Sequence, residues 1–268
     1  GLVGCMASLS ISSKNKSVCL IEKNKINKII TDDYSPLSLS INSVNFLKEK
    51  NIWDENLIKS NLIESLYIKL FNSFNTIKIS TSDINFESIG QVVDKASFLS
   101  YLRNLSKKNK NIDVIDNTEL DMKQLESLSK IYLPNESEAV DFGQLIVTDG
   151  ANSKIAEKLN IPYKNINYDQ TSYIFNGEYD SMENSTAQIF TDKGVFAVLP
   201  GHGNKKSIVA TVHNKFIDDF KFESNTINEH LLERQILPYV KNLKNLKLIY
   251  KHPLNTARLD NWFFKETL

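Results

Sequence analysis

Residues 145–153 place an acidic side chain where a buried strand is expected to end. An apolar run leads into Asp149 and Gly150, and a polar-apolar pattern follows. This order predicts a strand, a tight turn and then a helix, with Asn152 or Ser153 as its N-cap. A carboxylate at the carboxyl end of a buried strand faces the crevice where α/β sheets bind nucleotides. The alternative is that Asp149 and Gly150 form only a turn.

A second set of residues, near the N-terminus, has the spacing of half a dinucleotide-binding fingerprint. Gly1 and Gly4 open a run of small and apolar residues, and Glu22 ends a strand predicted at residues 17–22. Small residues at a helix start let the backbone approach a pyrophosphate, whose charge the helix N-terminus stabilises. Glu22 follows Gly4 by 18 residues (22 − 4). A ribose-binding acid is expected at roughly 20 residues.

The composition is that of a globular protein without a strong electrostatic field. The 268 residues include 32 Lys or Arg and 32 Asp or Glu, so the net charge is zero. This balance argues against nucleic acid as a partner. Cys5 and Cys19 are expected to be buried free thiols. With no apolar run of membrane-spanning length and no secretory leader, we expect a cytoplasmic protein, with peripheral attachment at the inner face of the membrane as an alternative.

The elements that must position these residues alternate between strands and helices. Pro36 is expected to open a helix that runs to about Lys50. Residues 95–108 predict a helix whose buried face includes Phe98, Leu99, Leu102 and Leu105. Strands are predicted at 89–94 and 112–115, and two more strands are predicted between 62 and 79. Residues 119–142 are expected to form a small antiparallel layer. Four strand-like runs follow at 168–176, 186–191, 194–200 and 207–213, then a helical pattern over 216–244 and a strand at 248–251.

The Asp-Gly-Ala-Asn-Ser sequence at 149–153 resembles the Asp-Gly motif of the FAD-dependent aromatic monooxygenases of the para-hydroxybenzoate hydroxylase class. It looks most like the ubiquinone-biosynthesis hydroxylases, of the 2-octaprenyl-phenol hydroxylase type. The glycines followed by Leu-Ile-Glu at 20–22 resemble the same class. The longest similarity lies in the sheet of residues 168–200, which resembles the substrate domain of these enzymes.

The resemblance implies an α/β (α+β) fold. A Rossmann-like FAD-binding domain of the glutathione-reductase type would carry an inserted antiparallel β-sheet substrate domain. The FAD-binding domain would comprise 1–61 and 82–160, with 245–268 returning to it. The substrate domain would comprise 62–81 and 161–244.

The resemblance also assigns roles to five residues. Gly1 and Gly4 would let the backbone approach the pyrophosphate of FAD, and Glu22 would bind the adenosine ribose. Asp149 and Gly150 would hold the flavin side of the crevice. No residue stands out as a catalytic acid or base, and no metal-ligand spacing is found. His202, in a Gly-rich loop, is the one histidine expected to be able to face a pocket, although a solvated turn histidine is the simpler interpretation.

The function implied is FAD-dependent, NAD(P)H-reduced hydroxylation of a phenolic, prenylated ring in ubiquinone biosynthesis, with association with the membrane or a biosynthetic complex. Where these enzymes usually carry an Arg, this chain has Tyr34 or Ser35. We also expect truncation at both ends, because the first glycine of the fingerprint would precede Gly1 and a Gly-Asp motif would follow Leu268. The alternatives are a non-catalytic, partner-binding fragment of such an enzyme and a related hydroxylase with a non-quinone aromatic substrate.

Overall fold

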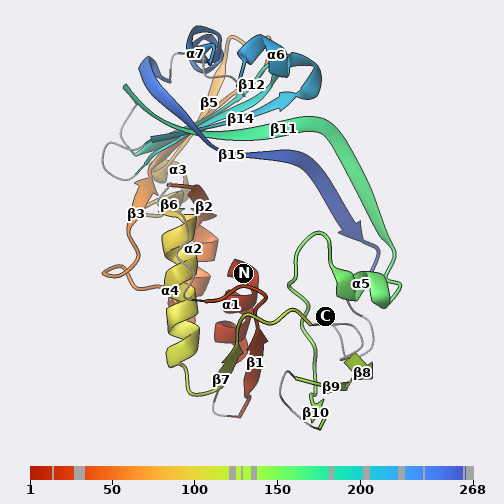
Figure 1. The fold of residues 1–268 in the computed structure, drawn as a ribbon. Helices are drawn as coiled ribbons and strands as arrows, with labels where there is room; N and C mark the ends of the chain where they lie inside the picture. The colour runs from red at the N-terminus through yellow and green to blue at the C-terminus, as the bar shows by residue number, and fades with distance from the viewer. Residues whose placement is uncertain are drawn as a thin grey trace. The chain divides into compact units, whose positions relative to one another are not determined.

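The computed structural model describes residues 1–13, 15–26, 34–120, 125–127, 129–133, 138–180, 184–201, 206–222, 227–237, 239–261 and 263. The chain divides into two compact units. Unit 1 comprises Gly1–Ile30, Leu99–Ile166 and Asn255–Leu268, and unit 2 comprises Thr31–Phe98 and Asn167–Leu254. Both units are discontinuous in sequence, like the two domains expected above, whose boundaries stay a prediction. Figure 1 shows the elements of each unit.

Unit 1 is built on two parallel strands and a helix that begins after the first glycine. Helix α1 (Leu2–Ile11) leads into β1 (Val18–Ile21), which pairs in parallel with β7 (Ile112–Ile115). Helix α4 (Lys95–Lys108) precedes β7 and confirms the helix predicted at 95–108. The unit also holds α5 (Lys154–Lys158) and a small antiparallel sheet, as expected within 119–142; its strands are β8 (Leu125–Ser127), β9 (Lys130–Ile131) and β10 (Val140–Asp141).

Unit 2 contains a three-stranded antiparallel sheet covered by one helix. The strand order is β2 (Pro36–Ser40), β6 (Gly90–Asp94), β3 (Ser60–Ile63). Helix α2 (Ile41–Glu49) contacts β6 and β2.

The second sheet of unit 2 has seven strands and is mixed. Strand β12 pairs with β4 in parallel, whereas the pairs β11–β14, β14–β13, β13–β12 and β4–β5 are antiparallel. Figure 1 shows the short helices α6 and α7 over one face of this sheet. The strand order is β15 (Lys241–Leu259), β11 (Tyr163–Asp180), β14 (Lys206–His213), β13 (Gly194–Leu199), β12 (Ser185–Phe190), β4 (Ser65–Lys69), β5 (Thr76–Ser80). The remaining helices are α3 (Thr81–Ile84), η2 (Asn214–Phe216), α6 (Ile217–Phe220) and α7 (Glu229–Ile236).

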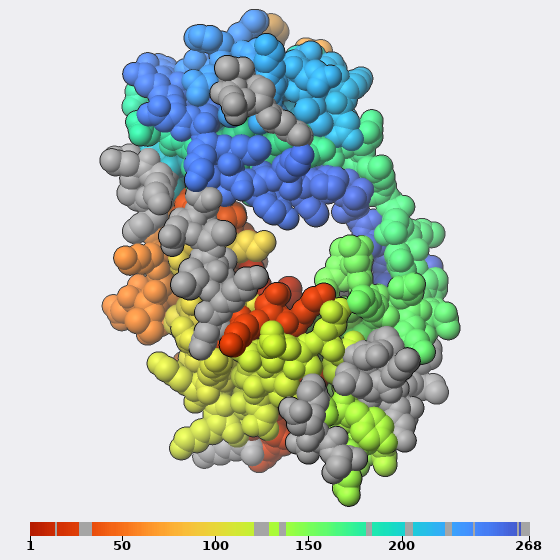
Figure 2. All heavy atoms as spheres, viewed as in Figure 1, coloured from red at the N-terminus to blue at the C-terminus, as the bar shows by residue number. Residues whose placement is uncertain are grey.

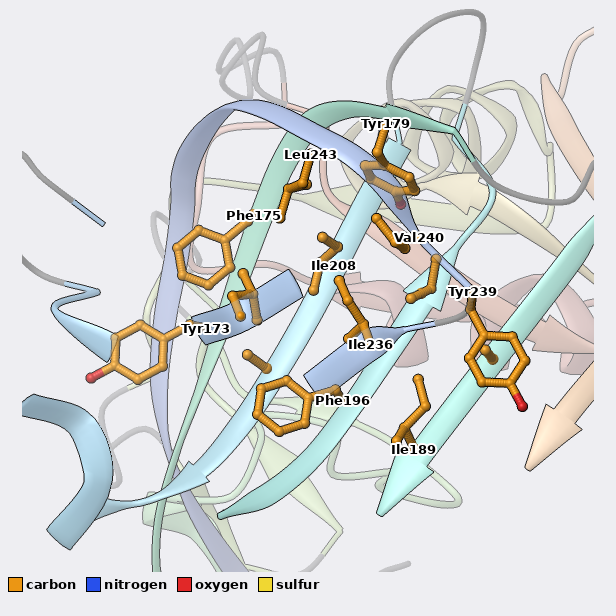
Figure 3. Packing of buried hydrophobic residues seen from close by; sticks show 14 of the residues in the cluster. Tyr173, Phe175, Tyr179, Ile189, Phe196, Ile208, Ile236, Tyr239, Val240 and Leu243 are labelled. Atoms are coloured by element: carbon orange, nitrogen blue, oxygen red, sulfur yellow. The ribbon is translucent and has the colours of Figure 1, made fainter. Parts of the chain in front are cut away.

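Alternating side chains on the central strands build the main core of unit 2. Along β13, every second residue is buried, as expected for a sheet with one covered face. These side chains meet apolar residues of α6 and α7, including Phe220, Leu232 and Ile236, all fully buried. Figure 3 shows Phe196, Ile208 and Ile236 within this cluster. The mixed α/β architecture and its large sheet confirm the predicted fold class.

Two element predictions within unit 2 are wrong. Pro36 opens strand β2 rather than a helix, and the helix begins at Ile41 with Ser40 as its N-cap. The alternating sequence of β2 pairs with β6, and a proline is tolerated as the first residue of a strand. The helical pattern predicted over 216–244 also extends too far, since α7 ends at Ile236 and strand β15 begins at Lys241. Strand β15 is much longer than the short strand predicted at 248–251.

Replacing Gly194 with alanine is expected to destabilise unit 2 by more than about 1 kcal/mol. Gly194 has a φ of 151°, and an added Cβ would lie 2.1 Å from the Thr211 carbonyl oxygen on the neighbouring strand. The matched control is Gly143→Ala, where nothing lies within 4 Å of the added Cβ. Urea unfolding followed by circular dichroism measures both changes. Equal midpoints for the two variants would contradict this account of β13.

Candidate functional site

The N-terminus of α1 begins at a glycine, which has no side chain to cap it. Gly1 is its N-cap and makes no side-chain capping bond, and the first turn has no acidic residue. The first N–H groups of a helix lack intrahelical partners and carry the positive end of its dipole, which suits a phosphate group. Gly1 is exposed, and Figure 2 shows the first part of the chain, in red, at the surface of the molecule.

Glu22 lies at this helix terminus although it is distant in sequence. It directly follows β1, is only 7% exposed, and its Oε2 accepts a hydrogen bond from the Gly1 nitrogen. Its Oε1 accepts a second bond from the Asn24 N–H at 3.1 Å. Burial disfavours its charged form, but these hydrogen bonds, the charge of the Gly1 amino group and, last, the charge of Arg103 hold the pKa of Glu22 below its usual value. The structure therefore brings together the predicted glycine-led helix and the predicted acid.

Arg103 is the residue of this region that the sequence interpretation missed. It lies on α4, is 4% exposed, and its Nη2 is 3.7 Å from Glu22 Oε2. The signal was present in the helix pattern, since residues 99, 102, 103 and 106 share one helical face. Three of them, Leu102, Arg103 and Ser106, are buried. A charged residue inside an apolar stripe is rarely buried without a partner. That rule would have identified Arg103 as a residue with a buried, oppositely charged neighbour.

The Asp-Gly segment lies beside the same helix. The Cβ of an alanine at Gly4 would be 2.9 Å from the Thr148 hydroxyl oxygen, which places the residue before Asp149 against the first turn of α1. Asp149 and Gly150 are exposed, and Gly150 has a φ of 100°, which favours glycine. The N-cap prediction is confirmed, because the Ser153 hydroxyl accepts the Ala156 N–H at 3.0 Å.

The buried strand predicted before Asp149 is wrong. No strand is formed between β10 and α5, and Ile146 is 37% exposed. An apolar run becomes a strand only where another strand supplies hydrogen-bond partners. Leu145 forms a single bridge, and no named strand of the described residues continues the pairing along 146–148. The turn and the capped helix remain, because both depend on local interactions.

Replacing Gly4 with alanine is expected to destabilise unit 1 by about 1–3 kcal/mol, because the added methyl group overlaps the Thr148 hydroxyl. Adding Thr148→Ala to this variant should recover most of the lost stability, because it removes the overlapping hydroxyl. Thermal unfolding of the two single variants and the double variant measures the coupling. If Thr148→Ala restores nothing, the helix and the Asp-Gly segment are not packed in this way.

Tyr34, which stands where the resembled enzymes carry Arg, is held within unit 2. It is 6% exposed, its carbonyl accepts the Asn176 side-chain amide at 2.9 Å, and its hydroxyl donates to the Pro200 carbonyl at 3.5 Å. Burial, followed by the charge of Asp94, raises the pKa of Tyr34 to about 12. Tyr34 therefore supplies a neutral phenol attached to the large sheet, instead of a positive charge.

Other candidates have structural roles or lie outside the described residues. Asp94 caps α4, accepting the Ser97 N–H at 2.9 Å. Cys5 is buried but Cys19 is exposed, so the expectation of two buried thiols is half wrong. His202 lies outside the described residues. Among the residues described, no cluster of three metal-ligating side chains is found, and no helix is long and apolar enough to span a bilayer.

Comparison with solved structures gives the class of fold. Over its whole length, the chain superposes on PqsL, a probable FAD-dependent monooxygenase from Pseudomonas aeruginosa, with a TM-score of 0.74 and 10% identity, covering 74% of that chain. It also superposes on 2-methyl-3-hydroxypyridine-5-carboxylic acid oxygenase (TM-score 0.70, 15% identity, 71% of that chain) and on the flavin-dependent halogenase CmlS (0.71, 12%, 50%). The chain has the fold of FAD-dependent monooxygenases.

Sequence comparison adds one relative. The chain is 26% identical over 220 residues to the mitochondrial ubiquinone biosynthesis monooxygenase COQ6 of Caenorhabditis elegans, which covers 75% of this chain and 48% of that protein. The chain thus spans about half the length of this curated relative. No family model matches the chain. The resemblance to FAD-dependent aromatic monooxygenases that the sequence predicted is confirmed.

Proposed function

We propose that this chain carries the adenosine-binding part and the substrate sheet of an FAD-dependent monooxygenase that hydroxylates a phenolic ring. The observation that carries the proposal is the contact between Glu22 and Gly1 at the uncapped N-terminus of α1. A helix terminus for a pyrophosphate and a carboxylate for ribose hydroxyls are the two groups that bind the adenosine diphosphate half of FAD.

The residues present fit this cofactor. The N–H groups at the start of α1 would bind the pyrophosphate, with Gly1 leaving open space around its Cα, since nothing lies within 4 Å of an added Cβ. Glu22 would accept hydrogen bonds from the adenosine ribose. Asp149 and Gly150 are exposed and directly follow Thr148, which lies beside Gly4, and they would hold the flavin side. Flavin, when bound, supplies the oxygen-activating chemistry, with NAD(P)H as the proposed reductant.

The proposed substrate is a prenylated phenol of ubiquinone biosynthesis. The similarity to a ubiquinone biosynthesis monooxygenase supports this assignment, and PqsL, which shares the fold, has been solved in complex with 2-aminobenzoylacetate. The seven-stranded sheet of unit 2 would line the substrate side, with the buried Tyr34 and Asn176 as its polar groups. Such an enzyme needs a dry, oriented pocket more than a catalytic acid or base.

Purification of the chain and incubation with FAD tests the proposal. We expect yellow protein with flavin absorption after gel filtration, and quenched flavin fluorescence on binding. ADP-ribose should compete with FAD, because it carries the pyrophosphate and ribose groups that α1 and Glu22 would bind. Colourless protein that stays free of FAD would favour the alternative, a non-catalytic fragment. If FAD binds but prenylated phenols do not stimulate NAD(P)H oxidation while simple aromatic acids do, the non-quinone hydroxylase is favoured.

We further propose that the enzyme attaches peripherally to membranes through the turn between β4 and β5. Leu70, Phe71 and Phe74 are exposed there, and Lys69 and Lys78 flank them. Aromatic side chains next to basic residues suit the boundary of an anionic bilayer. The variant Phe71→Ser/Phe74→Ser should lose most co-sedimentation with phosphatidylserine-containing vesicles, whereas the exposed control Phe86→Ser should keep it. Equal sedimentation of both variants would contradict this attachment. The cytoplasmic location stays a prediction.

A further inference from the structure

The strongest unexplained feature of unit 1 is a pair of buried opposite charges. Among the residues that the structure describes, Glu22 and Arg103 are the two charged side chains that are buried. They come from different elements, the end of β1 and the middle of α4, and are 81 residues apart (103 − 22). Burying a charge is unfavourable unless an opposite charge lies near it. Glu22 lies beside Arg103 and the Gly1 amino group, and Arg103 lies beside Glu22.

The geometry leaves the carboxylate free to bind more than it already does. Arg103 Nη2 lies 3.7 Å from Glu22 Oε2, which is an ion pair rather than a hydrogen bond. Arg103 Nε is also buried without a hydrogen-bond partner among the described residues. Arg103 therefore acts on Glu22 through its charge and does not occupy the acceptor sites of the carboxylate. A carboxylate has about four such sites, and the Gly1 and Asn24 nitrogens use two.

We infer that Arg103 is a positioning residue, which keeps Glu22 ionised and oriented to accept the ribose hydroxyls of FAD. The inference rests on the proposed function and extends it to a residue that touches no cofactor group itself. Arginine suits this role because it stays protonated when buried, whereas a lysine can lose its proton. A buried carboxylate without a cation would take up a proton and lose acceptor capacity.

The other groups that face Glu22 are the Gly1 amino group and the Cys5 thiol, both from α1, and the Asn24 amide after β1. The Gly1 amino group is positively charged and forms an ion pair with Oε2. Burial raises the pKa of the Cys5 thiol, so Cys5 is neutral at physiological pH. The amide is neutral as well. Arg103 is therefore the one charged side chain among these groups.

The test measures FAD affinity by flavin fluorescence from about pH 5 to about pH 8. Arg103→Met should raise the pKa of Glu22. The FAD affinity of this variant should therefore begin to fall at a higher pH than the affinity of the wild type as the solution is made more acidic. Arg103→Lys should restore most of the affinity at neutral pH. Arg234→Met, which removes an exposed arginine on α7, is the matched control and should leave the pH profile unchanged.

The outcomes separate this inference from the proposed function. If the wild type does not bind FAD, the proposed function fails; the pKa of Glu22 can then still be measured by carbon-13 NMR in wild type and Arg103→Met, and equal values would overturn the role of Arg103. If the wild type binds FAD and the FAD affinity of Arg103→Met is lower by the same factor at every pH, Arg103 has only a structural role. Should Arg103→Met not fold, Glu22→Gln/Arg103→Met decides: a folded double variant supports the charge coupling, and an unfolded one overturns it.

Discussion

Replacing Glu22 with glutamine is expected to weaken FAD binding by roughly 10- to 100-fold. The substitution keeps the size of the side chain but removes the charge that strengthens hydrogen bonds from ribose hydroxyls. Fluorescence titration with FAD measures the change. Asp113→Asn, an exposed acid on the neighbouring strand β7, is the control and should bind FAD as the wild type does. Equal affinities of Glu22→Gln and wild type would remove Glu22 from the site.

The same substitution is expected to lower stability, because it leaves Arg103 buried without a counter-charge. Breaking a buried pair costs about 3–5 kcal/mol. The pKa of Glu22 is lowered in the folded protein, since burial is outweighed by hydrogen bonds, by the charge of the Gly1 amino group and by that of Arg103. Its contribution to stability is therefore present above the unfolded pKa of about 4.3 and lost as the pH falls through the lower folded value. Urea unfolding of Glu22→Gln should show a weaker loss of stability in acid than the wild type.

Replacing Phe220 with alanine is expected to lower the free energy of unfolding of unit 2 by about 3–5 kcal/mol. Phe220 is fully buried, with its ring centroid 4.8 Å from Phe222 and 5.8 Å from Phe196. Its removal leaves a cavity between α6 and the large sheet. Urea unfolding monitored by near-ultraviolet circular dichroism measures the loss, since the three rings contribute to that signal.

Phe74→Ala is the control for this core prediction. It removes the same atoms from a fully exposed position in the turn after β4 and should change stability by less than about 0.5 kcal/mol. Similar losses for the two phenylalanine variants would show that α6 does not cover the sheet as described.

Most elements of this protein could be predicted from local sequence. Helix α4 begins and ends where its apolar stripe predicted, and the strands of the large sheet follow their alternating patterns. The cap of α5 at Ser153 is confirmed because a capping bond links residues three positions apart. The glycine-led helix and the acid after the next strand were also recognisable, since their types and spacing are those that nucleotide binding requires.

The errors fall where a segment depends on distant partners. Pro36 reads as a helix start until β6, some 55 residues later in the chain, pairs with the segment and makes it a strand. Residues 145–148 read as a buried strand, but beyond a single bridge at Leu145 no named strand of the described residues pairs with them. Periodicity describes which face of a segment is apolar, and does not say which other segment will meet it.

The sequence by itself determined the helix and strand patterns of the large sheet and the candidate residues Gly1, Gly4, Glu22 and Asp149. Only the tertiary structure decided that Glu22 is buried beside Arg103, because that contact joins a strand end to a helix 81 residues away (103 − 22). The reason is physical. Local patterns follow from hydrogen bonds and side-chain positions a few residues apart, whereas the ionisation of a buried carboxylate depends on whichever charges the fold brings near it.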